Sequence, residues 1–252
     1  MAHEEYIRLV PGADTAVLFI HGILGTPNHF QKLIPLVPKN CSICNLLLPG
    51  HGGTVDDFSR SSMEQWRKYV EEKIRMLLAD HKRILIAAHS MGTLLAIEQA
   101  VDKPQHIGGL FLLAAPLRIR LRWQMIKNAW CVFRGNVSDN DPLLSATRDA
   151  CSIAQDKNIF RYLGWVPRYL ELFSVIFSVR KILPKLCVPG VVFQSRADEM
   201  VSIGSVSDLE ESKLLNITVL EHSRHFYYSP EDMADIMDAF GHFVGTCNIE
   251  AP

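Results

Sequence analysis

The stretch Arg83-Ile-Leu-Ile-Ala-Ala-His-Ser-Met-Gly92 decides the expected fold of this chain. Its run of Ile, Leu and Ala is typical of a strand buried on both faces of a parallel sheet, and the residues that follow show a helical pattern. A tight turn between strand and helix presents the hydroxyl of Ser90 at the carboxyl edge of the sheet. Small residues on both sides, Ala88 and Gly92, let the two backbones approach closely. This placement predicts a nucleophilic serine rather than a helix cap.

Similar apolar runs recur along the chain, with helical segments between them. Amphipathic helices are expected over residues 62–81 and about 230–244, where Ser62 and Ser229 provide N-terminal caps. Alternating strands and helices predict a three-layer α/β domain with right-handed crossovers. The expected strands are residues 16–20, 42–48, 83–88, 110–114, 190–194 and 217–220.

Residues 117–186 interrupt this alternation. Helical patterns at 120–133, 142–155 and 167–183 replace the strands. The segment holds 12 Lys or Arg against 5 Asp or Glu, a net charge of +7, whereas the remainder of the chain carries −8. We interpret it as a helical cap that is inserted in a single domain, residues 1–252, and lies over the open end of the sheet. A chain of this length commonly forms one such domain.

The composition of the chain excludes several classes of function and location. A net charge of −1 provides no global attraction to nucleic acid. The first ten residues lack the apolar core of a secretory signal, and no apolar run reaches the ~18 residues that span a bilayer, so we expect a cytoplasmic protein. The six scattered cysteines are expected to be reduced thiols, with Cys41 and Cys44 facing opposite sides of a strand. Metal-binding clusters and nucleotide-binding loops are not recognisable, so neither a metal nor a cofactor is expected.

Two further residues complete a catalytic arrangement around the serine. A serine hydroxyl is a weak nucleophile at neutral pH, so it needs a positioned base and a third group that holds the base. Asp198 follows the expected strand 190–194 and His225 follows 217–220, which places both at the edge that carries Ser90. We predict Ser90 as nucleophile, His225 as general base and Asp198 as the acid that orients it.

Other residues compete for these roles. His222 is the alternative base, because it lies closer to the end of its strand. Glu199 and Asp208 are the alternative acids, although Glu199 is one position out of register and Asp208 falls in an expected helix. We assign structural roles to three other histidines, His21, His51 and His242.

Four more motifs accompany the serine turn: Phe19-Ile-His-Gly-Ile-Leu-Gly25, Leu48-Pro-Gly-His-Gly52, Gln194-Ser-Arg-Ala-Asp-Glu-Met-Val201 and Ser223-Arg-His-Phe226. Together they resemble the His-Gly turn, the Pro-Gly-His-Gly loop, the acid loop and the histidine loop of the α/β-hydrolase superfamily, in particular its small carboxylesterases and monoacylglycerol lipases. The resemblance covers residues 15–115 and 187–245 but not the cap. It implies the α/β-hydrolase fold, a mostly parallel central sheet flanked by helices, with an inserted helical cap.

Acyl transfer also needs hydrogen-bond donors for the developing oxyanion, each worth about 3 kcal/mol of transition-state stabilisation. The amide of Met91, at the helix start, is the first candidate, and the resemblance implies the amide of Ile23 as the second. Two positions depart from the family pattern, since Ala88 and Ser195 stand where glycine is usual. Both residues are small enough to be compatible with activity.

The triad and the resemblance imply a serine hydrolase that cleaves carboxylic esters, either short- to medium-chain acyl esters or monoacylglycerols, through a covalent acyl-serine. The same triad also serves acyl transfer and peptide or C–C bond hydrolysis, and a ligand-binding receptor without turnover is a further alternative.

Cap composition bears on the substrate. Burial of each CH₂ contributes about 0.8 kcal/mol, so an apolar pocket favours an ester with an apolar acyl or aryl group. Part of the aromatic set is expected to line such a pocket: Trp123, Trp130, Phe133, Trp165, Phe173 and Phe177. We interpret the basic set of the cap as a solvated face rather than a membrane contact: Arg118, Arg120, Arg122, Lys127 and Arg134.

Overall fold

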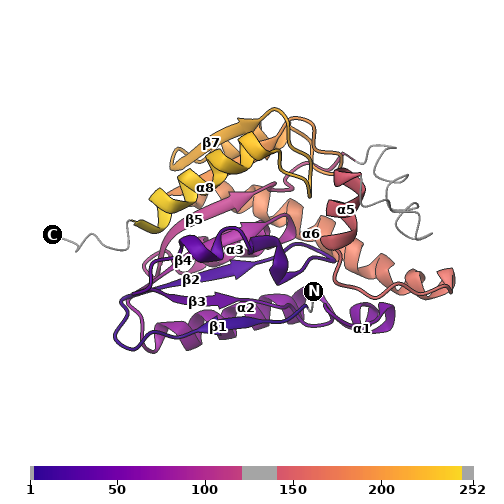
Figure 1. Ribbon diagram of the computed structural model, residues 1–252, viewed down its shortest axis with the longest axis horizontal. Coiled ribbons are helices and arrows are strands. Elements are labelled where there is room, and N and C mark those ends of the chain that lie inside the picture. Colours follow the sequence, from indigo (N-terminus) through magenta and orange to yellow (C-terminus); the bar gives the residue numbers. More distant parts are fainter. Residues whose placement is uncertain (1–2, 121–140, 246–252) are drawn as a thin grey trace.

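A seven-stranded sheet forms the centre of the computed structural model, which describes residues 3–120 and 141–245 (Figure 1). The strand order is β1-β3-β2-β4-β5-β6-β7, and every neighbouring pair is parallel except β1 with β3. The strands are β1 (Tyr6–Arg8), β2 (Thr15–Ile20), β3 (Ser42–Asn45), β4 (Arg83–His89), β5 (Ile107–Leu113), β6 (Gly190–Ser195) and β7 (Leu215–Leu220).

All six expected strands form, and two differences have physical reasons. β3 ends at Asn45 instead of residue 48, because the amide of Leu48 donates to Nε2 of His21 (3.1 Å) instead of to a neighbouring strand. β1 was not predicted, since it is a three-residue edge strand with exposed side chains at Tyr6 and Ile7 and has no apolar run.

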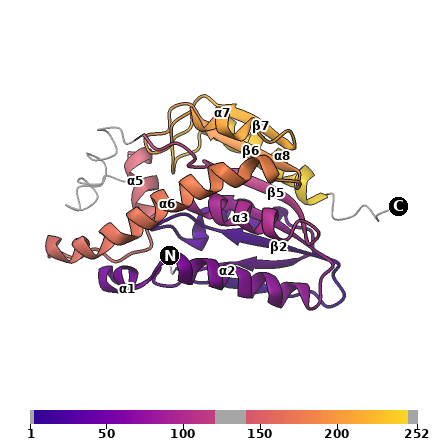
Figure 2. The same ribbon diagram turned by 180° about the vertical axis from the view of Figure 1, so that it is seen from behind.

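Helices cover both faces of the sheet, as Figures 1 and 2 show. The larger core holds apolar residues of α2 (Met63–Leu78), α3 (Met91–Asp102) and α6 (Val166–Ile182). The smaller core, on the other face, holds residues of α8 (Pro230–Gly245) and the 3-10 helix η1 (Pro27–Phe30). The shorter elements are α1 (Val55–Arg60), α7 (Ser205–Leu209) and the 3-10 helix η2 (Ile34–Leu36).

The chain leaves neighbouring strands β2 and β4 toward opposite faces. η1 follows β2 and packs into the smaller core, whereas α3 follows β4 and packs into the larger one. Adjacent parallel strands whose connections diverge in this way open a crevice at their carboxyl ends, where α/β proteins bind ligands. The turns at His21 and Ser90 therefore meet at that crevice.

The segment between β5 and β6 contains helices but no strand among its described residues. It contains α5 (Pro142–Asp149), the 3-10 helix η3 (Ile159–Trp165), α6 and the 3-10 helix η4 (Leu183–Lys185). The helix expected over 142–155 is shorter than predicted, and the one expected over 120–133 lies outside the described residues apart from its first residue.

Two main-chain hydrogen bonds place part of this segment at the carboxyl edge of the sheet. The amide of Ser152 donates to the carbonyl of Leu24 (2.9 Å), and the amide of Ala154 donates to that of Gly53 (2.9 Å). α6 instead packs beside α3 on the flank of the sheet, because Leu172, Val175, Ile176 and Val179 are buried in the larger core. Within the described ranges, every helix is too short or too polar to cross a bilayer.

Cys41 and Cys44 lie on opposite sides of the sheet, as the period-two geometry of a strand predicts. Cys41 belongs to the smaller core and Cys44 to the larger one, and neither forms a disulfide. Burial raises the pKa of the Cys44 thiol to about 12, with a further contribution from the charge of Glu5. This thiol is therefore held in its protonated form at neutral pH.

Candidate active site

Ser90 occupies a strained turn between β4 and α3. Its φ of 52° and ψ of −126° lie in a region that costs a non-glycine residue about 1–3 kcal/mol. Gly92 is required in this turn, because a Cβ there would lie 2.7 Å from the carbonyl oxygen of His21 and closer still to that of Ile20. Ala88 is fully buried in the larger core, so its methyl group is accommodated at the position where glycine is usual. The turn thus holds the Ser90 hydroxyl above the end of β4.

Ser90, His225 and Asp198 form one hydrogen-bonded chain. Nε2 of His225 lies 3.1 Å from Oγ of Ser90, and Nδ1 of His225 lies 2.8 Å from Oδ2 of Asp198. The other carboxylate oxygen, Oδ1, accepts the amides of Met200 (2.7 Å) and Val201 (2.8 Å). All three members of the chain are buried.

The surroundings of His225 set its protonation. Burial lowers the pKa of this imidazole, but the charge of Asp198 and its hydrogen bond raise it by more, so the pKa lies above the ordinary value for histidine. Because Asp198 accepts a hydrogen bond from Nδ1–H, the neutral imidazole presents the lone pair of Nε2 to the hydroxyl of Ser90. This arrangement can take a proton from Ser90.

Main-chain contacts hold the loop that carries His225. Its amide donates to Oε2 of Glu199 (3.3 Å), and its carbonyl accepts from Nε2 of His89 (3.0 Å). His29 stacks on His89 with 3.8 Å between ring centroids. Burial lowers the pKa of both supporting histidines, that of His29 to about 3, so they are neutral. Sequence reasoning missed these contacts, since no local signal distinguishes a histidine that supports a loop.

The alternative acids, Glu199 and Asp208, and the alternative base, His222, make contacts outside the Ser90–His225–Asp198 chain. Asp208 pairs with Arg118 (2.8 Å) and with Arg180 (3.3 Å). Glu199 contacts the main chain of His225 rather than its ring. The side chain of His222 is exposed, and its amide donates to Asp232.

His21 and His51 stabilise the turns beside the site. Nδ1–H of His21 donates to the carbonyl of Gly22 (2.9 Å), and Nδ1–H of His51 donates to that of Leu48 (3.2 Å). Burial lowers the pKa of His21 to about 4, against the opposing effect of its hydrogen bond to Gly22. His242, in contrast, is an exposed residue beside Asp238 on α8.

Two residues are predicted to supply the oxyanion amides, Met91 and Ile23. Met91 is the first residue of α3. Ile23 lies in a turn that is closed by a hydrogen bond from the amide of Gly25 to the carbonyl of Gly22 (3.0 Å). A Cβ on Gly22 would lie 2.8 Å from Cβ of Ser90, so this turn packs directly against the serine.

A cavity of about 730 Å³ lies between η1, α5 and the loop after His225, and it is lined by the neighbour of His225, Phe226, but not by the three triad residues themselves. Phe226, whose ring centroid lies 4.6 Å from that of His225, forms part of its wall together with His29, Tyr228 and Cys151. Nε2 of His29 and Oη of Tyr228 are buried without a hydrogen-bond partner. Among residues 3–120 and 141–245, no cluster of His, Cys, Asp and Glu has the geometry to hold a metal ion.

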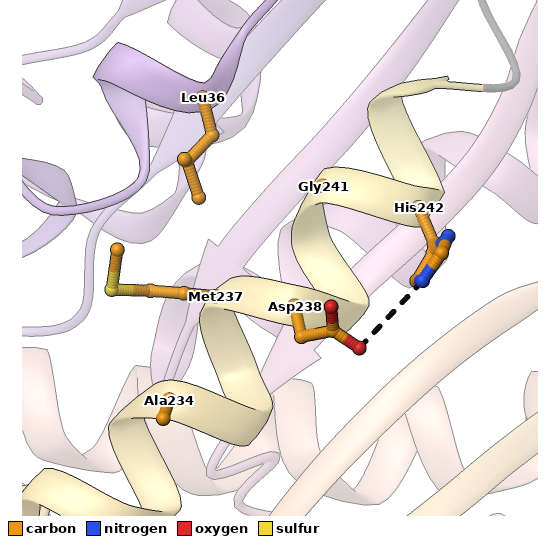
Figure 3. Close-up of a pocket in the computed structure, with 6 residues that line it drawn as sticks. All are labelled: Leu36, Ala234, Met237, Asp238, Gly241 and His242. Carbon is orange, nitrogen blue, oxygen red and sulfur yellow. Dashed lines mark ion pairs between the residues drawn. The ribbon is translucent and has the colours of Figure 1, made fainter.

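A second hollow, of about 660 Å³, lies away from the triad between α8 and η2 (Figure 3). Asp238 and His242 line it 3.6 Å apart, and Met237 points from α8 toward Leu36. This hollow contains none of the residues predicted to be catalytic.

Comparison with known proteins identifies the family. A monoacylglycerol lipase of Xenopus laevis is 24% identical over 243 residues, which cover 85% of this chain and 71% of that protein. A thermostable monoacylglycerol lipase of Bacillus sp. (strain H-257) is 31% identical over 93 residues, 36% of this chain and 37% of that protein. The crystal structure of a Paleococcus ferrophilus monoacylglycerol lipase has the same fold, with a TM-score of 0.70 at 19% identity over 97% of this chain and 99% of that one. Residues 17–239 match the model of the alpha/beta hydrolase family, and the chain belongs to that family.

Proposed function

We propose that this protein hydrolyses carboxylic esters through a covalent acyl-Ser90 intermediate. The observation that carries the proposal is the buried chain from Oγ of Ser90 through the imidazole of His225 to the carboxylate of Asp198, with contacts of 3.1 and 2.8 Å. A nucleophile, a base and a group that orients the base are the three parts that such catalysis needs. The monoacylglycerol lipases among the relatives support an ester as substrate.

The reaction follows from this geometry. Oγ of Ser90 attacks the ester carbonyl while Nε2 of His225 takes the hydroxyl proton, and Asp198 stabilises the imidazolium that forms. The amides of Met91 and Ile23 donate to the oxyanion of the tetrahedral intermediate. Nε2–H of His225 then protonates the leaving alkoxide, and the acyl group remains on Ser90. Water, activated by the same nitrogen, releases the acid.

The substrate is a small-molecule ester with an apolar acyl or aryl group. The cavity beside Phe226 has the size of a small-molecule site. We assign residues 117–186 to a cap within the single domain, because Ser152 and Ala154 bond to loops at the carboxyl edge. Two aromatic residues expected as pocket candidates are excluded, since Phe173 and Phe177 are 48% and 60% exposed on the outside of α6.

Covalent labelling tests the assignment of the nucleophile. A fluorophosphonate should modify Ser90, as located by peptide mass spectrometry, and Ser90→Ala should abolish both labelling and turnover of p-nitrophenyl esters without lowering the unfolding temperature. Ser207→Ala, at an exposed serine of α7, is the matched control and should retain both activities. Labelling at another residue, or wild-type turnover by Ser90→Ala, would refute the proposal. Amides and alcohol acceptors in the same assay separate ester hydrolysis from peptide cleavage and acyl transfer.

A further inference from the structure

An apolar ridge runs along the outside of η3 and α6. Its members are large side chains that are between 48% and 73% exposed. From Leu163 onward they recur at intervals of three and four residues, so they lie on one face of the helix. The ridge consists of Ile159, Phe160, Leu163, Val166, Leu170, Phe173 and Phe177.

This face of α6 has no partner among the described residues. Figure 2 shows α6 as an outer element that lies in front of α3. The opposite face is buried in the larger core through Leu172, Val175 and Val179, so the helix is apolar on both sides. A surface helix normally presents polar residues to water, and a contiguous exposed apolar patch marks an interaction site. α6 alone extends the ridge over roughly 25 Å.

Unpaired cations stand at both ends of the ridge. Lys157 is exposed beside Ile159, and Nζ of Lys181 lies 4.0 Å from the ring centroid of Phe177. Of the nearby charges, Arg168 pairs with Glu171, Arg180 shares Asp208 with Arg118, and Arg161 pairs with both Asp156 and Asp56. The net charge of these groups together with Lys157 and Lys181 is positive, and the excess lies at the Lys181 end, which complements an anionic surface.

The same charges disfavour head-to-head pairing of two copies of this chain. If two ridges met head to head, Lys157 would face Lys157 and Lys181 would face Lys181. The head-to-head arrangement is penalised, because it brings the two positively charged Lys181 ends together.

The ridge offers little hydrogen bonding to a protein partner. Protein interfaces carry about ten direct hydrogen bonds. The hydroxyl of Ser178, between two ridge positions, already donates to the carbonyl of Ser174 (3.0 Å), and the guanidinium of Arg168 is turned inward to the carbonyl of Ser59 (2.7 Å). An apolar face bordered by cations fits the boundary between lipid headgroups and acyl chains.

One end of the ridge lies close to the active-site edge. Trp165, at the end of η3, donates its indole N–H to the carbonyl of Val55 (3.2 Å), the first residue of α1. α1 follows the loop at Gly53, which receives the amide of Ala154 at the carboxyl edge of the sheet. We propose that the ridge docks the protein on an anionic lipid surface, from which the ester substrate is drawn. The identity of the ester substrate in this inference rests on the proposed function. The binding of the ridge to lipid does not depend on it.

Vesicle sedimentation tests the docking directly. The protein should bind vesicles of phosphatidylcholine mixed with phosphatidylglycerol, and binding should weaken with added salt. Phe160→Ser and Phe177→Ser should each lower the partition coefficient roughly five- to tenfold, since each removes an apolar anchor. Lys157→Gln and Lys181→Gln should each lower it about fivefold on the mixed vesicles and have little effect on phosphatidylcholine alone.

Matched controls separate docking from folding and from catalysis. Met76→Ser on α2 and Leu214→Ser before β7 remove exposed apolar residues elsewhere and should leave vesicle binding unchanged. All ridge variants should keep wild-type rates on soluble short-chain esters and wild-type circular dichroism. The proposal would be overturned if the wild type did not bind vesicles, or if the control variants lost as much vesicle binding as the ridge variants. It would also be overturned if light scattering showed that the wild type is a dimer and that Phe177→Ser converts it to a monomer. If the wild type and Ser90→Ala both bind vesicles but the wild type turns over no ester, only the proposed function is overturned. The docking inference would stand.

Discussion

The imidazole of His225 is the residue whose titration should govern catalysis. Its pKa is raised because the charge and hydrogen bond of Asp198 outweigh the effect of burial. The base must be neutral to accept the proton of Ser90, so kcat/KM should fall as pH decreases through this raised pKa. We expect the midpoint above the ordinary histidine value of about 6.5 in a pH profile with p-nitrophenyl acetate.

Asp198→Asn provides the control for this pH dependence. It removes the charge that raises the pKa, so the residual activity should have a lower midpoint and kcat should fall by about 10⁴-fold, as when the triad acid of other serine hydrolases is replaced by its amide. A wild-type midpoint well below 6.5, or an unshifted midpoint in the variant, would contradict the assigned role.

His89 supports the base through its main chain. Nε2–H of His89 donates to the carbonyl of His225, and a buried carbonyl without a donor costs about 1–3 kcal/mol. His89→Leu should therefore let the histidine loop shift and lower kcat roughly ten- to a hundredfold, with little change in KM. Steady-state kinetics and the unfolding temperature measure the two effects. His89→Gln, which keeps a donor, should recover part of kcat; if both variants behave alike, the hydrogen bond is not the cause.

At the scale of elements, Asp208 joins α7 to two distant segments. It accepts from Arg118, after β5, and from Arg180, near the end of α6. The side-chain hydrogen bond from Arg118 is the main cause that lowers the pKa of Asp208, with burial opposing and Arg180 assisting. These contacts stabilise the position of α6 against the sheet.

Asp208→Ala should consequently loosen these elements without affecting the reaction. Because the two arginines are almost half-exposed, the loss should be modest, about 1–2 kcal/mol in the free energy of unfolding. Urea denaturation measures this loss, and ester turnover below the unfolding transition should equal that of the wild type. A collapse of turnover comparable with that of Asp198→Asn would mean that Asp208 is the catalytic acid.

At the scale of the whole molecule, several buried histidines connect stability to pH. Burial is the main cause that lowers the pKa of His21 to about 4 and that of His29 to about 3, and it also lowers those of His51 and His89. The unfolded chain binds protons at these sites below about pH 6.5, where the folded protein does not. Their contribution to stability is thus complete above that pH and is lost progressively as pH falls toward 4.

We expect the unfolding temperature to drop by several degrees between pH 7 and pH 5. The raised pKa of His225 acts in the opposite sense, since its contribution is present at low pH and is lost as pH rises through the folded-state pKa, so it offsets part of the effect. Calorimetry across this range checks the prediction, and a flat or rising unfolding temperature on acidification would contradict it.

Much of the fold could be predicted, because it depends on local patterns. β4, the turn at Ser90 and α3 follow from an apolar run, small residues and a helical period within twenty residues of chain. β1 escaped prediction because a short exposed strand has no such pattern and forms only where β3 offers an edge. α5 is shorter than expected because residues beyond it bond to the loops at Leu24 and Gly53 instead of continuing the helix.

The sequence by itself determined six of the seven strands, the helices α2, α3 and α8, and which serine stands on a strained turn, since apolar periodicity and turn chemistry act over a few neighbouring residues. Only the tertiary structure decided that Glu199 holds the main chain of His225, that Asp208 serves two arginines, and that Phe173 and Phe177 face outward. These outcomes depend on packing between segments far apart in the chain. Short-range periodicity carries no information about which of several chemically equivalent side chains such packing brings together.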